Sequence, residues 1–242
     1  MAAVASMQSR GALPVIAVTG MAFEASIAAG KGRDGVEAVY AARADLLERA
    51  LTAALDRGAS GVISFGTAGG LGPDLEPGTL VIAEAVDGPF GRVECDPAWS
   101  ERMAAALLAS PLAAQTRRGV EAAVAAPLTG AADKAALHQS SGGALAVDME
   151  SHLAAAAAAA RGLPFAVCRA VVDPAWRSLP KAAMAGLRDD GSTAVLPILR
   201  ELARDPRQLG GLLRVAADAG AARKALTGAR RVLGASGALF PR

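Results

Sequence analysis

Acidic side chains stand where apolar, strand-like segments of the sequence end. "RAVVD" ends on Asp173, which Pro174 follows directly, "ALAVDME" ends with Asp148 and Glu150, and Glu24 follows closely after "PVIAVTG". A carboxylate at the end of so apolar a strand is costly to bury unless it is paired, exposed in a cleft or used to carry a proton. Separated carboxylates without a metal suit acid–base chemistry on a neutral substrate rich in hydroxyl groups.

A glycine-rich segment marks a further strand end. "FGTAGGLG" at 65–72 contains Thr67 and Gly69, and glycines there allow backbone N–H groups to approach an anion or a sugar oxygen closely. Taken singly, each feature also has an ordinary structural explanation. An acid such as Glu24 is favoured in the first turn of a helix, Asp148 suits a helix N-cap, and the glycine segment suits a plain turn.

The elements that must position these residues follow an α/β pattern. Short β-branched segments alternate with alanine-rich helical segments, which indicates parallel strands joined by crossover helices. We expect strands over 14–20, 61–70, 78–86, 119–127 and 163–176, helices over 41–58 and 97–110, and a short strand leading into a long helix over 144–162. The sequence therefore predicts one three-layer α/β/α domain over 1–242 with a central mixed, mainly parallel sheet. Residues 1–13 are expected to be a flexible tail and 180–242 a helical C-terminal part.

Composition and motifs exclude several classes of function. The 25 basic and 23 acidic residues give no electrostatic footprint for nucleic acid. The segment "TGMAFEA" lacks the glycines of a dinucleotide site, "AAGKGRDG" is not a phosphate-binding P-loop, and no G-x-S-x-G elbow occurs. His138 and His152 have no second ligand at metal spacing, so we expect neither a metal nor a cofactor. No apolar segment is long enough to span a membrane, and we expect a cytoplasmic protein.

Four short motifs resemble one family when they are taken in order. "GMAFEA", "FGTAGGL" followed by "LEPGTLVIAEAV", "VDMES" and "RAVVD" occur in the order found in the purine nucleoside phosphorylase and methylthioadenosine/S-adenosylhomocysteine nucleosidase superfamily. The resemblance covers roughly residues 14–180 and depends on the four motifs together. "ADKAALH", "VDMESH" and "DPAWRSLP" look most like the branch associated with bacterial hopanoid lipid biosynthesis, which is thought to remove adenine from adenosylhopane.

The resemblance implies a role for each matching residue. Asp173 resembles the general acid that protonates or hydrogen-bonds N7 of the purine, and Glu24 resembles the glutamate that activates water for attack at C1′. Glu150 resembles the glutamate that holds the ribose hydroxyls, and Met149 resembles the methionine packed on the sugar or base. Thr67 occupies the Ser/Thr position of the glycine loop. A carboxylate on the sugar face and an acid at the base are what an oxocarbenium-like transition state needs.

The sequence departs from the family pattern and leaves alternatives open. Val172 stands where the nucleosidases commonly have Ser, and Glu24 aligns only across a one-residue gap. Arg169 either supports a carboxylate or meets phosphate, for which Lys31 and Arg33 are further candidates. Glu24 favours water over phosphate as nucleophile, because a second anion beside phosphate would be repelled.

The partners implied are a nucleoside substrate carrying a lipid-like 5′ group, phosphate if the reaction is phosphorolysis, a second copy of the chain, and a membrane surface touched peripherally. The alternatives are phosphorolysis of the same substrate, a methylthioadenosine/S-adenosylhomocysteine nucleosidase, and a nucleoside-binding protein without catalysis.

Overall fold

A computed structural model describes residues 13–30, 32 and 35–242. The flexible tail predicted for residues 1–13 lies almost wholly outside the described residues, as do Lys31 and Arg33. One eight-stranded sheet forms the centre of the protein, with the order β2-β1-β3-β7-β6-β4-β5 and with β8 paired to both β3 and β4. The strands are β1 (Val15–Thr19), β2 (Val36–Tyr40), β3 (Gly61–Gly70), β4 (Leu80–Gly88), β5 (Gly91–Glu94), β6 (Thr116–Ala123), β7 (Ala146–Asp148) and β8 (Phe165–Asp173).

The sheet is mixed and mainly parallel, as the sequence predicts. Strand β1 runs parallel to β2 and β3, β3 runs parallel to β8, and β6 runs parallel to β4 and β7. Antiparallel pairs join β3 to β7, β4 to β5 and β4 to β8. Because β3, β7, β6, β4 and β8 pair in a closed circuit, the sheet curls upon itself and brings distant strand ends together.

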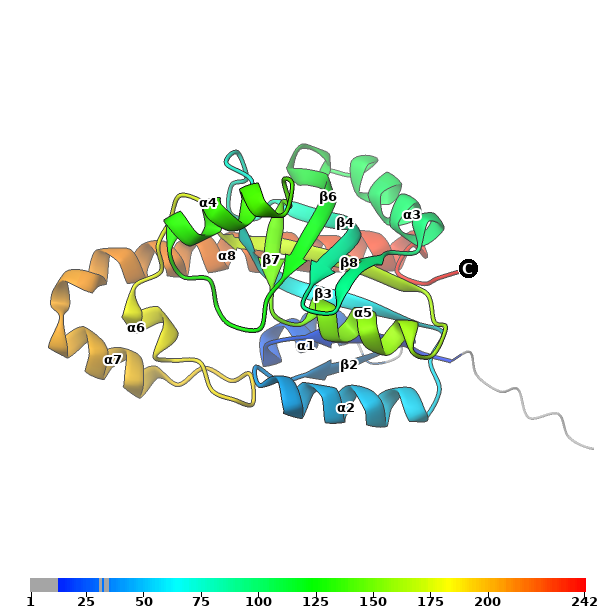
Figure 1. Cartoon of the computed structure of the whole chain (residues 1–242), viewed down its shortest axis with the longest axis horizontal. Helices are drawn as coiled ribbons and strands as arrows, with labels where there is room; N and C mark the ends of the chain where they lie inside the picture. The colour runs from blue at the N-terminus through cyan, green and yellow to red at the C-terminus, as the bar shows by residue number, and fades with distance from the viewer. Residues whose placement is uncertain (1–12, 31, 33–34) are drawn as a thin grey trace, which may run out of the picture.

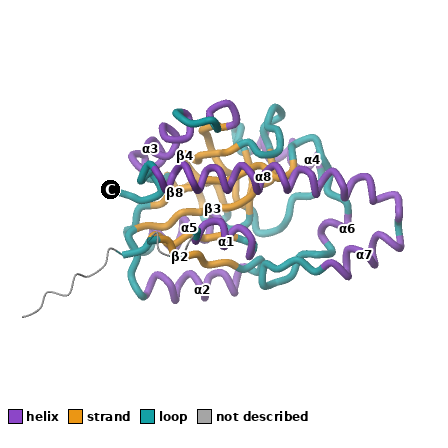
Figure 2. The backbone as a smooth tube through the Cα atoms, turned by 180° about the vertical axis from the view of Figure 1, so that it is seen from behind, coloured by secondary structure: helices purple, strands orange, loops and turns teal. Residues whose placement is uncertain are grey.

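Helices cover both faces of the sheet, and alternation along the strands explains the three layers. Val15 and Ala17 of β1 face one apolar cluster, whereas Ile16 and Val18 face the other, as the two-residue period of a strand requires. Helices α1, α3 and α8 pack on the first face, and α2 and α5 pack on the second. Figure 2 shows α8 crossing the sheet on the face opposite α2 and α5. The helices are α1 (Ala22–Ala29), α2 (Ala44–Asp56), α3 (Pro97–Leu108), α4 (Ala131–Ser140), α5 (Ser151–Ala159), α6 (Lys181–Met184), α7 (Val195–Arg204) and α8 (Leu209–Ala235).

Some element boundaries differ from the sequence-based expectation. The strand expected over 119–127 runs from Thr116 to Ala123, because the chain leaves the sheet before Pro127. Strands β2 and β5 and helices α1 and α4 were not predicted. Strand β2 lies at the sheet edge and β5 is an exposed hairpin partner of β4, so neither carries the long apolar run that marks a buried strand.

The part of the chain after residue 180 is largely helical, as expected. Helix α6 is followed by a turn closed by the bridge between Leu187 and Thr193, and α7 and the start of α8 extend away from the sheet (Figure 1). The second half of α8 returns to the core, where Leu226 and Leu233 are fully buried. Within the described residues, no helix combines the length and apolarity that crossing a bilayer requires.

Candidate active site

Six of the predicted site residues line one pocket at the ends of the strands. Thr67 and Gly69 come from the end of β3, Asp173 is the last residue of β8, and Glu24 lies in the first turn of α1. Met149 and Glu150, between β7 and α5, complete the set. The seventh, Arg169, does not line the pocket. It lies one layer deeper and is fully buried in β8.

Glu24 accepts hydrogen bonds at both carboxylate oxygens. Its Oε2 accepts the backbone N–H groups of Gly20 and Met21, each at 3.1 Å, which is the helix-capping role expected of a first-turn acid. Its Oε1 accepts the backbone N–H of Thr67 at 2.8 Å and the Thr67 hydroxyl at 2.6 Å. Four donors therefore fill about all of the acceptor positions that a carboxylate offers. Of the four, only the Thr67 hydroxyl can rotate away to admit another donor.

Two glycines permit this close assembly. A Cβ atom on Gly20 would lie 2.5 Å from Oε1 of Glu150, and a Cβ on Gly66 would lie 2.5 Å from Nη1 of Arg169. Both contacts are too short for real atoms, so the site depends on glycine at these positions. The glycine-rich strand end thus admits side chains from neighbouring elements.

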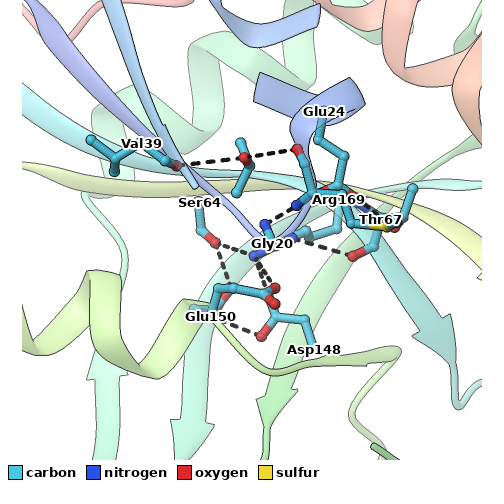
Figure 3. A network of polar contacts seen from close by, with 11 residues as sticks. Gly20, Glu24, Val39, Ser64, Thr67, Asp148, Glu150 and Arg169 are labelled. Atoms are coloured by element: carbon cyan, nitrogen blue, oxygen red, sulfur yellow. Dashed lines mark hydrogen bonds and ion pairs between the residues drawn. The ribbon is translucent and has the colours of Figure 1, made fainter. Parts of the chain in front are cut away.

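Arg169 links the acids of the site (Figure 3). Its Nη2 lies 2.5 Å from Oδ2 of Asp148 and 3.1 Å from Oε2 of Glu150. The same guanidinium donates to the Ser64 hydroxyl at 2.6 Å and to the backbone oxygen of Thr67 at 3.2 Å. Of the two functions that the sequence left open for Arg169, the geometry favours the support of carboxylates over direct contact with phosphate.

Asp148 and Glu150 differ in how they are held. Asp148 accepts the backbone N–H of Ser151 at 3.1 Å and also pairs with Arg169. The N-cap of α5 is Glu150, so the N-cap position that the sequence suggested for Asp148 is wrong. Burial raises the pKa of Glu150 above its usual range, and the Arg169 guanidinium partly opposes that rise. Arg169 itself loses solvation on burial, but Asp148 and Glu150 more than offset this loss, so its pKa also lies above its usual range.

Asp173 occupies a different environment on the other side of the pocket. It is only 6% exposed, and it forms an ion pair with Lys134 of α4, a side chain buried completely. Burial raises the pKa of Asp173, although the Lys134 ammonium group works against this rise. Lys134 was not among the predicted site residues, although it belongs to the motif "ADKAALH", because a lysine is ordinarily expected on the solvent-exposed face of a helix.

Glu121 on β6 is a second residue that sequence reasoning missed. It is fully buried, and neither carboxylate oxygen has a hydrogen-bond partner. Burial, followed by the nearby Asp148 carboxylate, raises the pKa of Glu121 well above its usual range. A carboxyl group in such a position favours its neutral, protonated form.

The remaining wall of the pocket is apolar. Met184 and Leu187 contribute from the C-terminal part and Leu179 from the segment just before it, and Leu128 and Val172 also line the pocket. This C-terminal segment is attached to the start of α1, since the backbone N–H of Ala22 donates to the oxygen of Gly191 at 3.1 Å. The pocket therefore has carboxylates on the sheet side and methyl-bearing side chains toward the C-terminal helices. Throughout the described ranges, no cluster of three or more His, Cys, Asp or Glu side chains is arranged to hold a metal ion.

The three-layer fold is shared with solved structures of nucleosidases and of a futalosine hydrolase. One is 5′-methylthioadenosine/S-adenosylhomocysteine nucleosidase from Neisseria meningitidis in complex with methylthio-immucillin-A, with 18% identity, a TM-score of 0.63, and coverage of 92% of this chain and 100% of that chain. Another is futalosine hydrolase of Helicobacter pylori strain 26695, with 14% identity, a TM-score of 0.66, and coverage of 91% and 97%. At these identities the likeness is one of fold.

The family is defined by sequence. Residues 29–195 match the model of the phosphorylase superfamily, and the chain belongs to that superfamily. The matched segment includes Thr67, Glu150, Arg169 and Asp173, whereas Glu24 precedes it. The search of curated proteins returned no match.

Proposed function

We propose that the protein hydrolyses the N-ribosidic bond of a 5′-substituted adenosine and releases adenine. The observation that carries this proposal is that Asp173, Glu150 and Glu24 reach one pocket from three separate elements. In the proposed reaction a water oxygen bonds to C1′ while the bond from C1′ to the purine nitrogen breaks. Asp173 gives its proton to N7 of the departing adenine, and the water proton passes to Glu24. Glu150 accepts hydrogen bonds from the ribose hydroxyls, with Met149 beside the sugar.

Water suits this pocket better than phosphate does. Among the described residues that line it, Glu24, Asp148, Glu150 and Asp173 are acidic and none is Lys or Arg. A phosphate ion would meet repulsion there without the cationic donors that normally bind it. The Thr67 hydroxyl, turning away from Glu24, would free the acceptor position that takes the water proton. Phosphorolysis remains the alternative outcome of the test below.

For the 5′ substituent we propose a large apolar group, with adenosylhopane as the specific substrate. Support comes from the apolar wall formed by Leu179, Met184 and Leu187, together with the resemblance of "VDMESH" and "DPAWRSLP" to the hopanoid-associated branch. A methylthioadenosine or S-adenosylhomocysteine nucleosidase is the competing possibility, since solved structures of such enzymes share the fold.

We further propose that the C-terminal helices touch a lipid surface from which such a substrate would enter. Large apolar side chains are exposed on α7 and the first turns of α8, namely Val195, Leu196, Leu199, Leu209 and Leu213. Sedimentation with phosphatidylcholine/phosphatidylglycerol vesicles tests this contact. Leu196→Ser combined with Leu199→Ser should reduce binding, while Leu108→Ser, an exposed leucine on α3, should not. Light scattering of the wild-type protein and the double variant gives the alternative outcome. If the wild-type protein is a dimer and the double variant a monomer, the patch binds a second copy of the chain instead of a lipid surface.

Adenine release, measured with and without phosphate, tests the central proposal. Adenosylhopane and methylthioadenosine should be compared side by side, with ribose or ribose 1-phosphate identified as the second product. Release from adenosylhopane without phosphate is expected. If adenine release depends on phosphate, the enzyme is a phosphorylase. If methylthioadenosine is turned over faster than adenosylhopane, the enzyme is a nucleosidase for soluble nucleosides. Tight binding with no release from either would leave a nucleoside-binding protein.

A further inference from the structure

Apart from Arg169, Lys134 is the most deeply buried cationic side chain among the described residues, and all of its hydrogen-bond donors are used. Its ammonium group donates to Oδ2 of Asp173 and to the backbone oxygens of Pro174 and Arg177, each of these two at 3.1 Å. An ammonium group has three protons to donate, so none is left for another partner. Lys134 does not line the pocket, and Asp173 stands between it and any ligand.

The contact divides the two oxygens of Asp173 between different tasks. Oδ2 is occupied by Lys134, whereas Oδ1 has no hydrogen-bond partner among the described residues. Asp173 lines the pocket, so Oδ1 is the oxygen available to a ligand. Donation to Pro174 and Arg177 also fixes the chain that leaves β8, and with it the direction of the Asp173 side chain.

We propose that Lys134 is a positioning residue that orients Asp173 and stabilises the carboxylate left behind when the base departs. The inference rests on the proposed function. In the step concerned, the O–H bond at Oδ1 of Asp173 breaks, an N–H bond forms at N7 of adenine, and Asp173 becomes a carboxylate beside the Lys134 ammonium group. Lys134 keeps its own protons throughout. It would take over the orienting function of the hydroxyl that is missing at Val172.

A purely structural role for Lys134 is a poor explanation of its burial. Removing a lysine from water is costly, and an apolar side chain of similar length would fill the same space at lower cost. The Asp173 carboxyl group faces the Lys134 ammonium group and compensates its charge, so the burial of Lys134 is explained by its contact with Asp173. Since Lys134 opposes the rise of the Asp173 pKa caused by burial, its removal should raise that pKa further.

The pH dependence of kcat/KM in Lys134→Met, Lys134→Gln and Lys134→Arg tests the proposal. In Lys134→Met the alkaline limb should move to higher pH, because Asp173 holds its proton longer, and kcat should fall by about 10- to 100-fold, since general-acid groups contribute on the order of 10²–10⁴. Lys134→Arg keeps a positive charge, so its kcat and the position of its alkaline limb should both stay close to those of the wild-type protein. Lys224→Met, on the exposed face of α8, is the matched control and should leave the profile unchanged.

Two measurements separate this inference from the proposed function. If Lys134 acts through Asp173, adding Lys134→Met to the Asp173→Asn variant should lower kcat little further. An equal fold-loss of kcat from Lys134→Met in the wild-type protein and in Asp173→Asn would overturn the proposal. Carbon-13 NMR titration of the Asp173 carboxyl group in the wild-type protein and in Lys134→Gln requires no substrate. An unchanged Asp173 pKa there would overturn the inference even if adenine is released. A raised pKa without adenine release from any substrate would refute only the proposed function.

Discussion

The two sides of the pocket bury carboxylates with different partners. On one side Arg169 serves Asp148 and Glu150 together, and Glu24 receives four hydrogen bonds. On the other side Asp173 forms an ion pair with Lys134, with the charge of Arg177 also acting on it, in a pocket whose lining includes Leu128 and Leu179. Burial raises the pKa of Glu150 and that of Asp173 alike, so the two sides differ in the donors that surround the acids and not in the direction of the pKa shift.

This difference matches the division of labour in the proposed reaction. In that reaction the donor-rich side places oriented carboxylates beside the sugar, where positive charge develops, and the donor-poor side presents the acid whose proton goes to the base. Environment, and not residue type, therefore distinguishes the acids. The experiments below are designed to reverse or weaken that difference.

Asp173→Asn should have the largest effect, because it removes the only proton carrier from the donor-poor side. We expect kcat to fall by about 10³-fold, while binding of the nucleoside changes little, since Asn fills the same space and can still hydrogen-bond to the base. Steady-state adenine release and equilibrium binding together check this. Asp74→Asn, on an exposed loop, is the control. A rate close to that of the wild-type protein would remove Asp173 from its proposed role.

Glu24→Gln should have the next largest effect, on the donor-rich side. Glutamine keeps the shape but cannot take the water proton, so hydrolysis should slow by about 10²-fold or more. Thr67→Ser, which keeps the hydroxyl, should retain activity. Release of ribose 1-phosphate at an undiminished rate in Glu24→Gln would show that phosphate, and not water, is the nucleophile.

Arg169→Met tests whether the donor-rich side depends on its shared cation. Removing one member of a buried ionic cluster leaves Asp148 and Glu150 without a counter-charge, and such losses cost about 3–5 kcal/mol. Chemical denaturation should show this as a lower midpoint. Arg49→Met, at an exposed position on α2 whose one ion pair within the described residues is a 4.0 Å contact with Asp45, should cost less than about 1 kcal/mol. Equal stabilities of the two variants would contradict the central place given to Arg169.

Glu121→Gln should have the smallest effect, and one that depends on pH. The folded-state pKa of Glu121 is raised by burial and by Asp148, so its contribution to stability is complete below the unfolded pKa and is lost as pH rises through the folded pKa. Glutamine does not titrate. The melting temperature of the variant, relative to the wild-type protein, should therefore rise between pH 5 and pH 9, by about 2 °C or more if roughly 1 kcal/mol is involved. A difference independent of pH would show that Glu121 does not titrate in this range.

The sequence was sufficient for the strands that carry the site. "PVIAVTG", "GVISFGTAGG" and "LPFAVCRAVVD" are apolar because their strands are buried on both faces, and this is visible without a structure. Their polar last residues are visible in the same way. The exposed strands β2 and β5 lack such a pattern and could not be recognised from sequence.

Which carboxylates follow which strands can be predicted from the sequence, because burial imposes a local pattern on each segment. The partners of these carboxylates could be found only from the fold. Lys134 reaches Asp173 across 39 residues and Arg169 reaches Ser64 across 105, and neither separation leaves a periodic trace. The charge state of each acid depends on these distant neighbours. The chemistry available to Asp173, Glu150 and Glu24 was therefore fixed by the way the curled sheet brings its strand ends together.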